Sequence, residues 1–218
     1  MKITLDDVQK DEAIKCYIKK ADESLVALGY TEHSFPHVCK VAAAAYRILD
    51  TLGYSKREAE LASIAGYLHD IGNVINRVDH AQSGAVMAFR ILDRMNADPD
   101  EIATIVTAIG NHDESTAFPV NPVAAALILA DKTDVRSSRV RNQDMSSFDI
   151  HDRVNYSVKE SSLIIDKAEI CLDIRIETEI CSVMDYFEIF LNRMILCKKS
   201  AEKLGVKFAL IINKQKMI

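Results

Sequence analysis

A histidine and an aspartate stand side by side at the end of an apolar, helix-like stretch, residues 66–73, with the sequence GYLHDIGN. Moving either group out of water without a partner costs roughly several kcal/mol or shifts its pKa. A fold that buries this stretch must therefore supply His69 and Asp70 with a charged or polar partner. This requirement favours folds in which other polar side chains meet the end of that helix.

The first 150 residues contain a succession of predicted amphipathic helices. Apolar residues recur at the three-to-four residue spacing of a helix that buries one face. Caps mark the helix starts: Ser55 with Glu58 three residues later forms a capping box, and Asp98 precedes Pro99. The predicted helices cover residues 11–28, 37–53, 55–72, 79–96, 98–112 and 121–136.

After about residue 150 the pattern changes. The second half of 162–177 alternates apolar and polar residues, which predicts a strand, and Asp166-Lys167 suits a hairpin turn. A helix over 179–205 and a last strand over 206–213 follow. The C-terminal third therefore combines strands with a long helix.

These patterns predict a mainly α fold in two parts. A helical domain covers residues 1–150, and a small α+β extension covers residues 151–218, with the polar loop 136–147 at the boundary. The chain has 218 residues, of which 49% are hydrophobic, so it can form a full hydrophobic core.

Composition argues against several classes of protein. A net charge of −5 gives no strong nucleic-acid signal, although a local basic patch stays possible. No apolar run approaches the ~18 residues of a membrane span, and the charged first twelve residues lack a signal-peptide core. The five cysteines form no CxxC pair, which indicates reduced thiols and a cytoplasmic protein. Cys39 is expected to be a buried free thiol.

Six polar residues lie next to apolar stripes, at helix ends or on a helix that should be buried. Each alone has an ordinary interpretation as a cap or a satisfied surface group. Together, imidazole nitrogens and carboxylate oxygens are the ligands that iron, manganese, zinc or cobalt accept, and separate helices can supply them inward. The six residues are His37, His69, Asp70, His80, His112 and Asp131.

The order of these residues resembles the HD superfamily of metal-dependent phosphohydrolases. HVCKVAAAAYRIL resembles its H-x-x-x-V helix, AGYLHDIGN its L-H-D-I-G signature, and LILADKTD its A-D-x-x-D segment. His80 in HAQSGA and His112 in AIGNHDE resemble the extra histidines of its two-metal branch. The resemblance covers roughly residues 35 to 136 and implies an HD-domain helical bundle.

The resemblance also implies a ligand set for one or two divalent ions, which could be Mn, Fe, Co, Ni, Zn or Mg. His37, His69, Asp70 and Asp131 would hold the first ion. Asp70 would bridge to a second ion held by His80 and His112.

The chain departs from some relatives in ways that bear on its substrate. Asn111 precedes His112 where some two-metal relatives have a second histidine. Asn73 after HDIG, together with AFPVNP in place of a Gly-Tyr-Pro element, puts a cyclic dinucleotide substrate in doubt. His33 and His151 match no motif and are expected to have surface roles.

The function that the resemblance implies is hydrolysis of a phosphomonoester or phosphodiester in a nucleotide or other small phosphorylated substrate, by metal-activated water. Asp70, Lys132 and Arg136 are the predicted catalytic residues, the last two as cations for the phosphate. Arg139 and Arg141 could assist, or could belong to a solvated loop. Asp113 or Glu114 could orient His112, or could be surface acids.

The sequence leaves two alternatives to hydrolysis open. A few HD relatives use the same ligand order to hold two irons and activate dioxygen, and others have become non-catalytic sensing or scaffold modules.

Residues 183–197 are rich in Met, Phe and Leu on more than one face. Core packing is the ordinary interpretation of that segment, and a homodimer contact is the alternative.

Overall fold

The structure is a computed structural model, which describes residues 2–142 and 144–218. Within these residues it has α-helices α1 (Leu5–Lys10), α2 (Glu12–Ala27), α3 (Phe35–Thr51), α4 (Lys56–Leu68), α5 (His80–Arg94), α6 (Pro99–Gly110), α7 (Pro122–Lys132), α8 (Ile150–Ser157) and α9 (Val183–Lys203). Three short 3-10 helices are η1 (Ile71–Val74), η2 (Ser137–Arg139) and η3 (Met145–Ser147). The strands are β1 (Val158–Ile165), β2 (Glu169–Ile176), β3 (Lys207–Ile212) and β4 (Gln215–Lys216).

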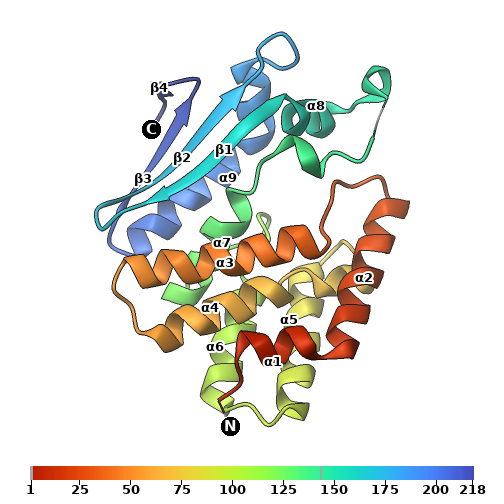
Figure 1. The fold of residues 1–218 in the computed structure, drawn as a ribbon, viewed down its shortest axis with the longest axis vertical. Coiled ribbons are helices and arrows are strands. Elements are labelled where there is room, and N and C mark those ends of the chain that lie inside the picture. The colour runs from red at the N-terminus through yellow and green to blue at the C-terminus, as the bar shows by residue number, and fades with distance from the viewer. Residues whose placement is uncertain (1, 143) are drawn as a thin grey trace.

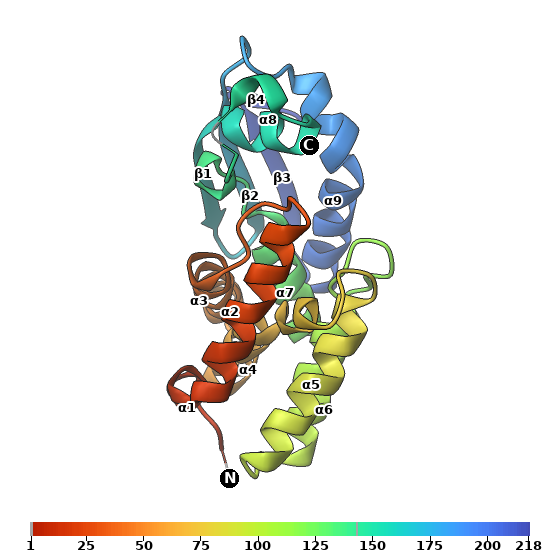
Figure 2. The ribbon, with the colours of Figure 1, turned by 90° about the vertical axis from the view of Figure 1, so that its right-hand side faces the viewer.

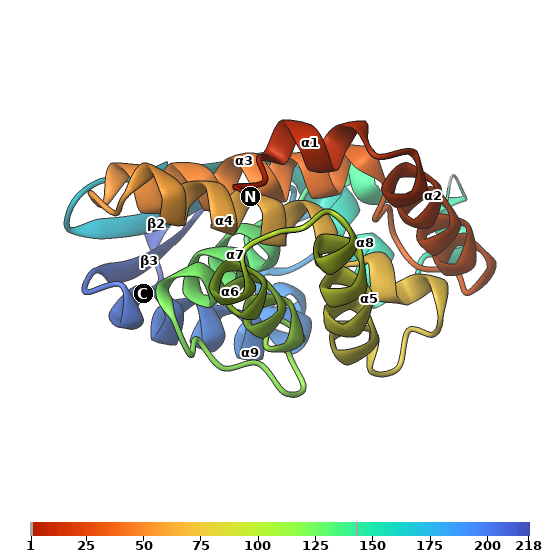
Figure 3. The ribbon, with the colours of Figure 1, turned by 90° about the horizontal axis from the view of Figure 1, so that it is seen from below.

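Helix α7 is the centre of the molecule. Every residue from Val123 to Ala130 is buried, as expected of a helix that is apolar around its whole circumference. Helices α3 and α4 pack side by side against α7 on one side, and α9 packs against it on another (Figures 1 and 3). The hairpin of α5 and α6 extends away from the sheet (Figure 2).

The four strands form one sheet at the opposite end from α5 and α6, in the order β1-β2-β3-β4 (Figure 1). β1 and β2 are antiparallel, whereas β2 and β3 are parallel and are joined through α9. Parallel neighbours need such a crossover connection, and α9 packs against β3 and β2. The sheet and α9 thereby cap one end of the helical body.

The fold confirms the predicted class: a mainly α body with a small α+β extension. The predicted capping box is present, with Ser55 Oγ accepting from the Glu58 backbone N–H at 3.1 Å. The alternating stretch is the β1–β2 hairpin, with Asp166-Lys167 in its turn. The division at residue 150 stays a prediction, and α7 and α9 pack against each other across it.

Among the described residues, helices α4 and α7 end four residues before their predicted ends, and helices α1 and α8 are additional. Helix α4 ends at Leu68 because the backbone turns at Asp70, where the Asn73 side-chain amide donates to the Asp70 carbonyl at 2.9 Å. Helix α7 ends at Lys132 rather than 136. The short helices α1 and α8 were not predicted; α8 has only eight residues and a polar composition.

The expectation that Cys39 is buried is wrong, because it lies on the exposed side of α3. None of the helices formed by residues 2–142 and 144–218 combines the length and the apolar character needed to cross a membrane.

Candidate metal centre

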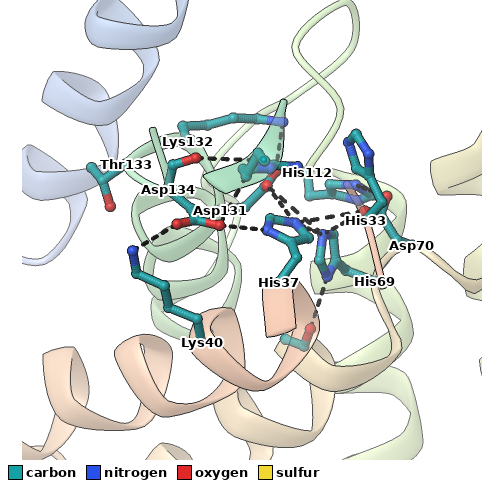
Figure 4. Close-up of polar contacts among 12 residues, drawn as sticks. His33, His37, Lys40, His69, Asp70, His112, Asp131, Lys132, Thr133 and Asp134 are labelled. Atoms are coloured by element: carbon teal, nitrogen blue, oxygen red, sulfur yellow. Dashed lines mark hydrogen bonds and ion pairs between the residues drawn. The ribbon is translucent and has the colours of Figure 1, made fainter. Parts of the chain in front are cut away.

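The structure brings the six predicted ligands together at the meeting point of five helix ends. His37 lies in the first turn of α3, and His69 and Asp70 form the turn after α4. His80 begins α5, His112 follows α6, and Asp131 lies near the end of α7. Five of the six are buried and Asp131 is nearly so. Figure 4 shows the side chains of His37, His69, Asp70, His112 and Asp131 converging from separate elements.

The first half of the cluster joins α3, the turn after α4, and α7. His37 Nε2 lies 3.3 Å from His69 Nε2 and 3.4 Å from Asp131 Oδ1. Asp70 Oδ2 lies 3.2 Å from His69 Nε2 and 3.7 Å from His37 Nε2. Two imidazoles and two carboxylate oxygens therefore surround one point.

The second half uses the other oxygen of the same aspartate. Asp70 Oδ1 lies 3.5 Å from His80 Nε2 and 3.9 Å from His112 Nε2, and these two nitrogens are 3.2 Å apart. Asn73 Nδ2 donates to Asp70 Oδ1 at 3.0 Å and so helps to fix the carboxylate. Asp70 thus presents one oxygen to each pair of histidines.

The Nδ1 atoms of these histidines face hydrogen-bond acceptors on the side away from the cluster, which favours the tautomer protonated at Nδ1. The Nδ1 atoms of His69, His80 and His112 lie 2.8, 3.1 and 2.6 Å from backbone carbonyls, which can only accept a hydrogen bond. His37 Nδ1 lies 2.8 Å from Asp134 Oδ2. In neutral rings with this tautomer, each Nε2 presents a lone pair to the cluster. A divalent cation fits this donor set, because it gives facing lone pairs and carboxylates a common partner.

The protonation states of most cluster residues also suit metal ligation. Burial lowers the pKa of His112 to about 3, with His69 and Lys132 adding to the effect, and burial likewise lowers the pKa of His80. Burial opposes ionisation of Asp70, yet neighbouring His69 holds its pKa well below the ordinary value. His69 differs: burial lowers its pKa, but Asp70 raises it above the ordinary value overall. Metal ligation needs ionised carboxylates and neutral imidazoles.

Two close backbone approaches set the spacing of the cluster. A side-chain carbon on Gly66 would lie 2.9 Å from Ala42 Cα, so this glycine lets α4 pack tightly on α3. A side-chain carbon on Gly72 would lie 2.0 Å from the His80 carbonyl oxygen and 2.5 Å from the Gly84 nitrogen. Gly72 therefore lets the HD turn lie against the start of α5.

The sequence analysis missed Asp134, although it lies within the A-D-x-x-D segment. It is 2% exposed and its Oδ2 accepts from His37 Nδ1, while its Oδ1 pairs with Lys40 Nζ at 2.7 Å and Arg136 Nε at 3.0 Å. Burial alone would raise the pKa of Asp134, but the hydrogen bond from His37 and the charge of Arg139 hold it far below the ordinary value. Asp134 thus orients the His37 ring, as acids behind metal-bound histidines do.

Replacing Asp134 with asparagine is expected to weaken divalent-ion binding about 10- to 100-fold, the usual effect of altering a partner behind a ligand. The variant keeps the volume and an acceptor but removes the charge that faces His37. Titration calorimetry with Mn²⁺ measures the change, and Asp93→Asn, on the exposed face of α5, is the control. Unchanged Mn²⁺ affinity in Asp134→Asn would show that Asp134 does not support the site.

A cavity of about 420 Å³ opens onto the cluster. Lys132, Arg139, Arg193 and Arg77 are its cationic lining residues. Lys132 Nζ lies 2.7 Å from Asp131 Oδ2, and Arg193 Nε donates to Glu114 Oε1 at 2.5 Å. Neither Arg77 nor Arg193 was singled out from the sequence, because each comes from a segment outside the quoted motifs.

The structure also shows where the other predicted phosphate-binding and orienting residues lie. Arg136 is bound to Asp134 and to Glu32 at 3.0 Å and does not line this cavity, so its catalytic role stays a prediction. Arg141 pairs with Asp22 instead. Glu114 lines the cavity, Asp113 Oδ1 lies 4.0 Å from His80 Nε2, and His112 Nδ1 is oriented by the Ile109 carbonyl at 2.6 Å rather than by either acid.

The two unassigned histidines also line the cavity. The expected surface role of His33 is wrong: its ring is partly buried, with its centroid 5.4 Å from that of His37. Burial, helped by the charge of Arg139, lowers the pKa of His33 well below the ordinary value. His151 is exposed, as expected.

Comparison with known proteins agrees with this geometry. The HD domain family matches residues 35–188, which include all six clustered residues. The chain is also 25% identical over 162 residues to the uncharacterized protein MJ1020 of Methanocaldococcus jannaschii, an alignment that covers 64% of this chain and 62% of that relative. The chain thus spans less than two thirds of the length of that relative. The family match covers most of the sequence, and the chain therefore belongs to the HD domain family, a superfamily of metal-dependent hydrolases.

Proposed function

We propose that this protein is a two-metal phosphohydrolase that cleaves a phosphomonoester or phosphodiester bond in a small substrate. The observation that carries the proposal is the placement of Asp70, with Oδ2 toward His37 and His69 and Oδ1 toward His80 and His112. A carboxylate shared between two histidine pairs suits a centre of two ions. Asp131 completes the first group of ligands.

His37, His69, Asp70 and Asp131 would hold one ion, and Asp70, His80 and His112 the other. Divalent ions in such sites polarise a phosphoryl oxygen and lower the pKa of water from 15.7 toward ~7. The protein residues contribute fixed positions: each histidine is anchored through Nδ1, and Asp70 is anchored through Asn73. This anchoring orients the ligands before a substrate arrives.

The cations of the cavity are placed to bind a phosphate beside the ligands. Lys132 is 6% exposed and touches Asp131, and Arg139 is 5% exposed. Guanidinium groups bind phosphate oxygens with paired hydrogen bonds, and burial strengthens such contacts. Lys132, Arg139 and Arg193 are therefore the proposed phosphate-binding residues.

The size of the cavity supports a small substrate. Its volume of about 420 Å³ lies within the ~300–1,000 Å³ typical of small-molecule sites. A nucleotide or a phosphorylated metabolite of similar size is therefore the proposed class of substrate.

A direct assay tests the proposal. Protein reconstituted with Mn²⁺ or Fe²⁺ is expected to hydrolyse an aryl phosphate or an aryl phosphodiester, and a chelator is expected to stop the reaction. Lys132→Ala should raise KM because it removes a phosphate-binding cation, whereas Lys198→Ala, exposed on α9, is the control. Oxygen consumption without any ester hydrolysis by the iron-loaded protein would contradict the proposal and favour a di-iron oxygenase.

A further inference from the structure

The cavity over the metal centre has a second polar wall, formed by α8, to which the proposed metal and phosphate binding assigns no role. Helix α8 contributes His151, Asp152 and Asn155 to the lining, and its N-cap residue Asp149 adds a fourth polar side chain. Helix α8 lies near the sheet and α5 lies farther from it (Figures 1 and 2), and both elements contribute residues to the lining. A ligand whose phosphate lies at the metal ligands would extend its other end toward α8.

The α8 wall presents hydrogen-bond acceptors that the protein leaves largely unused. Asn155 is only 7% exposed and its Nδ2 donates to the His151 carbonyl at 2.9 Å, yet its Oδ1 accepts from no residue that the structure describes. Asp152 has one long contact, 3.5 Å from Oδ2 to Asn142 Nδ2. An unpaired acceptor in the lining of a cavity is open to a donor on a ligand, and the Asn155 side-chain oxygen is such an acceptor.

The cations of the cavity do not serve this wall. Lys132 contacts Asp131, Arg193 contacts Glu114, and Arg139 donates to backbone carbonyls of Asp134 and Glu32. Although η2, which carries Arg139, packs against α8, no described hydrogen bond or ion pair joins a lining cation to Asp152 or Asn155. The acceptors at α8 are therefore available to donors on a ligand.

We propose that α8 recognises hydroxyl groups on the alcohol part of the substrate, which is a phosphorylated sugar or a similar polyol. This inference rests on the proposed function, because the phosphate is assigned to the metal end of the cavity. Asn155 Oδ1 and the Asp152 carboxylate accept hydrogen bonds from the hydroxyls. A site built to bind hydroxyls discriminates strongly against an analogue that lacks them, because its buried acceptors are then left unpaired.

Two esters of matched shape test the recognition. Ribose 5-phosphate carries hydroxyls on its five-membered ring, and cyclopentylmethyl phosphate has a similar ring without them. The metal-loaded protein is expected to show a kcat/KM at least tenfold higher for ribose 5-phosphate, with the difference mainly in KM. Equal kcat/KM for the two esters would overturn the proposal.

Variants of α8 locate the recognition. Asp152→Ala and Asn155→Leu are each expected to reduce the preference for ribose 5-phosphate over cyclopentylmethyl phosphate by at least tenfold. Arg153→Ala, exposed on the same helix and outside the cavity lining, should keep the wild-type preference. A preference that persists in both Asp152→Ala and Asn155→Leu would rule out α8 as the recognition element.

Equilibrium binding separates this inference from the proposed hydrolysis. Calorimetric titration of the Mn²⁺-loaded protein with each ester reports recognition even when neither ester is cleaved. Tighter binding of ribose 5-phosphate that is lost in Asp152→Ala supports the α8 proposal, even if the hydrolytic function fails. Aryl phosphate hydrolysis combined with equal binding of both esters would support the function and overturn the α8 proposal.

Discussion

Replacing Asp70 with alanine is expected to abolish phosphoester hydrolysis, with a loss of roughly a thousandfold or more in kcat. Loss of one catalytic hydrogen-bond donor alone costs about 10²–10³ in kcat, and Asp70 contributes to both groups of ligands. The physical reason is its position: Oδ2 and Oδ1 face different histidine pairs, so one substitution removes an oxygen from each. Initial rates on an aryl phosphate at saturating Mn²⁺ measure the effect.

The control for this variant is Asp93→Ala, which removes an exposed carboxylate from α5, and wild-type activity is expected for it. Circular dichroism checks that Asp70→Ala is folded. Folded Asp70→Ala protein that retains the wild-type rate would contradict a hydrolytic centre built on Asp70.

Replacing Gly72 with alanine is expected to displace α5 and to remove the His80 and His112 half of the site. The new methyl carbon would stand 2.0 Å from the His80 carbonyl oxygen, and backbone atoms at such a distance must move. Strain of this kind typically costs about 1–3 kcal/mol or more, so the melting temperature should fall by several degrees. Calorimetric melting and Mn²⁺ titration measure the two effects.

Gly110 provides a matched control, since it also lies in the helical body and a methyl group there would meet Ala85 Cβ at an ordinary 3.6 Å. Gly110→Ala should keep the melting temperature within a few degrees and keep Mn²⁺ binding. A Gly72→Ala protein with unchanged stability and unchanged Mn²⁺ stoichiometry would show that the close approach of η1 to α5 does not set the site.

The sequence predicts the helical body well because helix periodicity and caps are local signals. The capping box at Ser55 and the end of α3 near Gly53 depend on neighbours in the chain, and both are found. Helix α8 escaped prediction because it has only eight residues, mostly polar, and such a short segment carries little periodicity. The end of α4 at Leu68 was missed because it depends on contacts of Asn73 and Gly72 after the helix.

The candidate ligands could be identified from sequence because their residue types and order resemble a known family. The residues that surround and support these ligands could not be identified in the same way. Asp134 behind His37 and Arg193 from α9 act through tertiary contacts between segments far apart in the chain. Likewise, nothing in the local sequence around Asn155 indicates that this residue lines the same cavity as Asp70. Such contacts are set by packing rather than by local pattern.

Metal content per chain tests the central claim most directly, namely that four imidazoles and two carboxylates hold two divalent ions. Wild-type protein is saturated with Mn²⁺, freed of unbound metal by gel filtration, and measured by elemental analysis. We predict two ions per chain for the wild type and a loss of bound metal in Asp70→Ala. Wild-type protein that retains no metal after saturation, or an Asp70→Ala variant that retains two ions, would contradict the account.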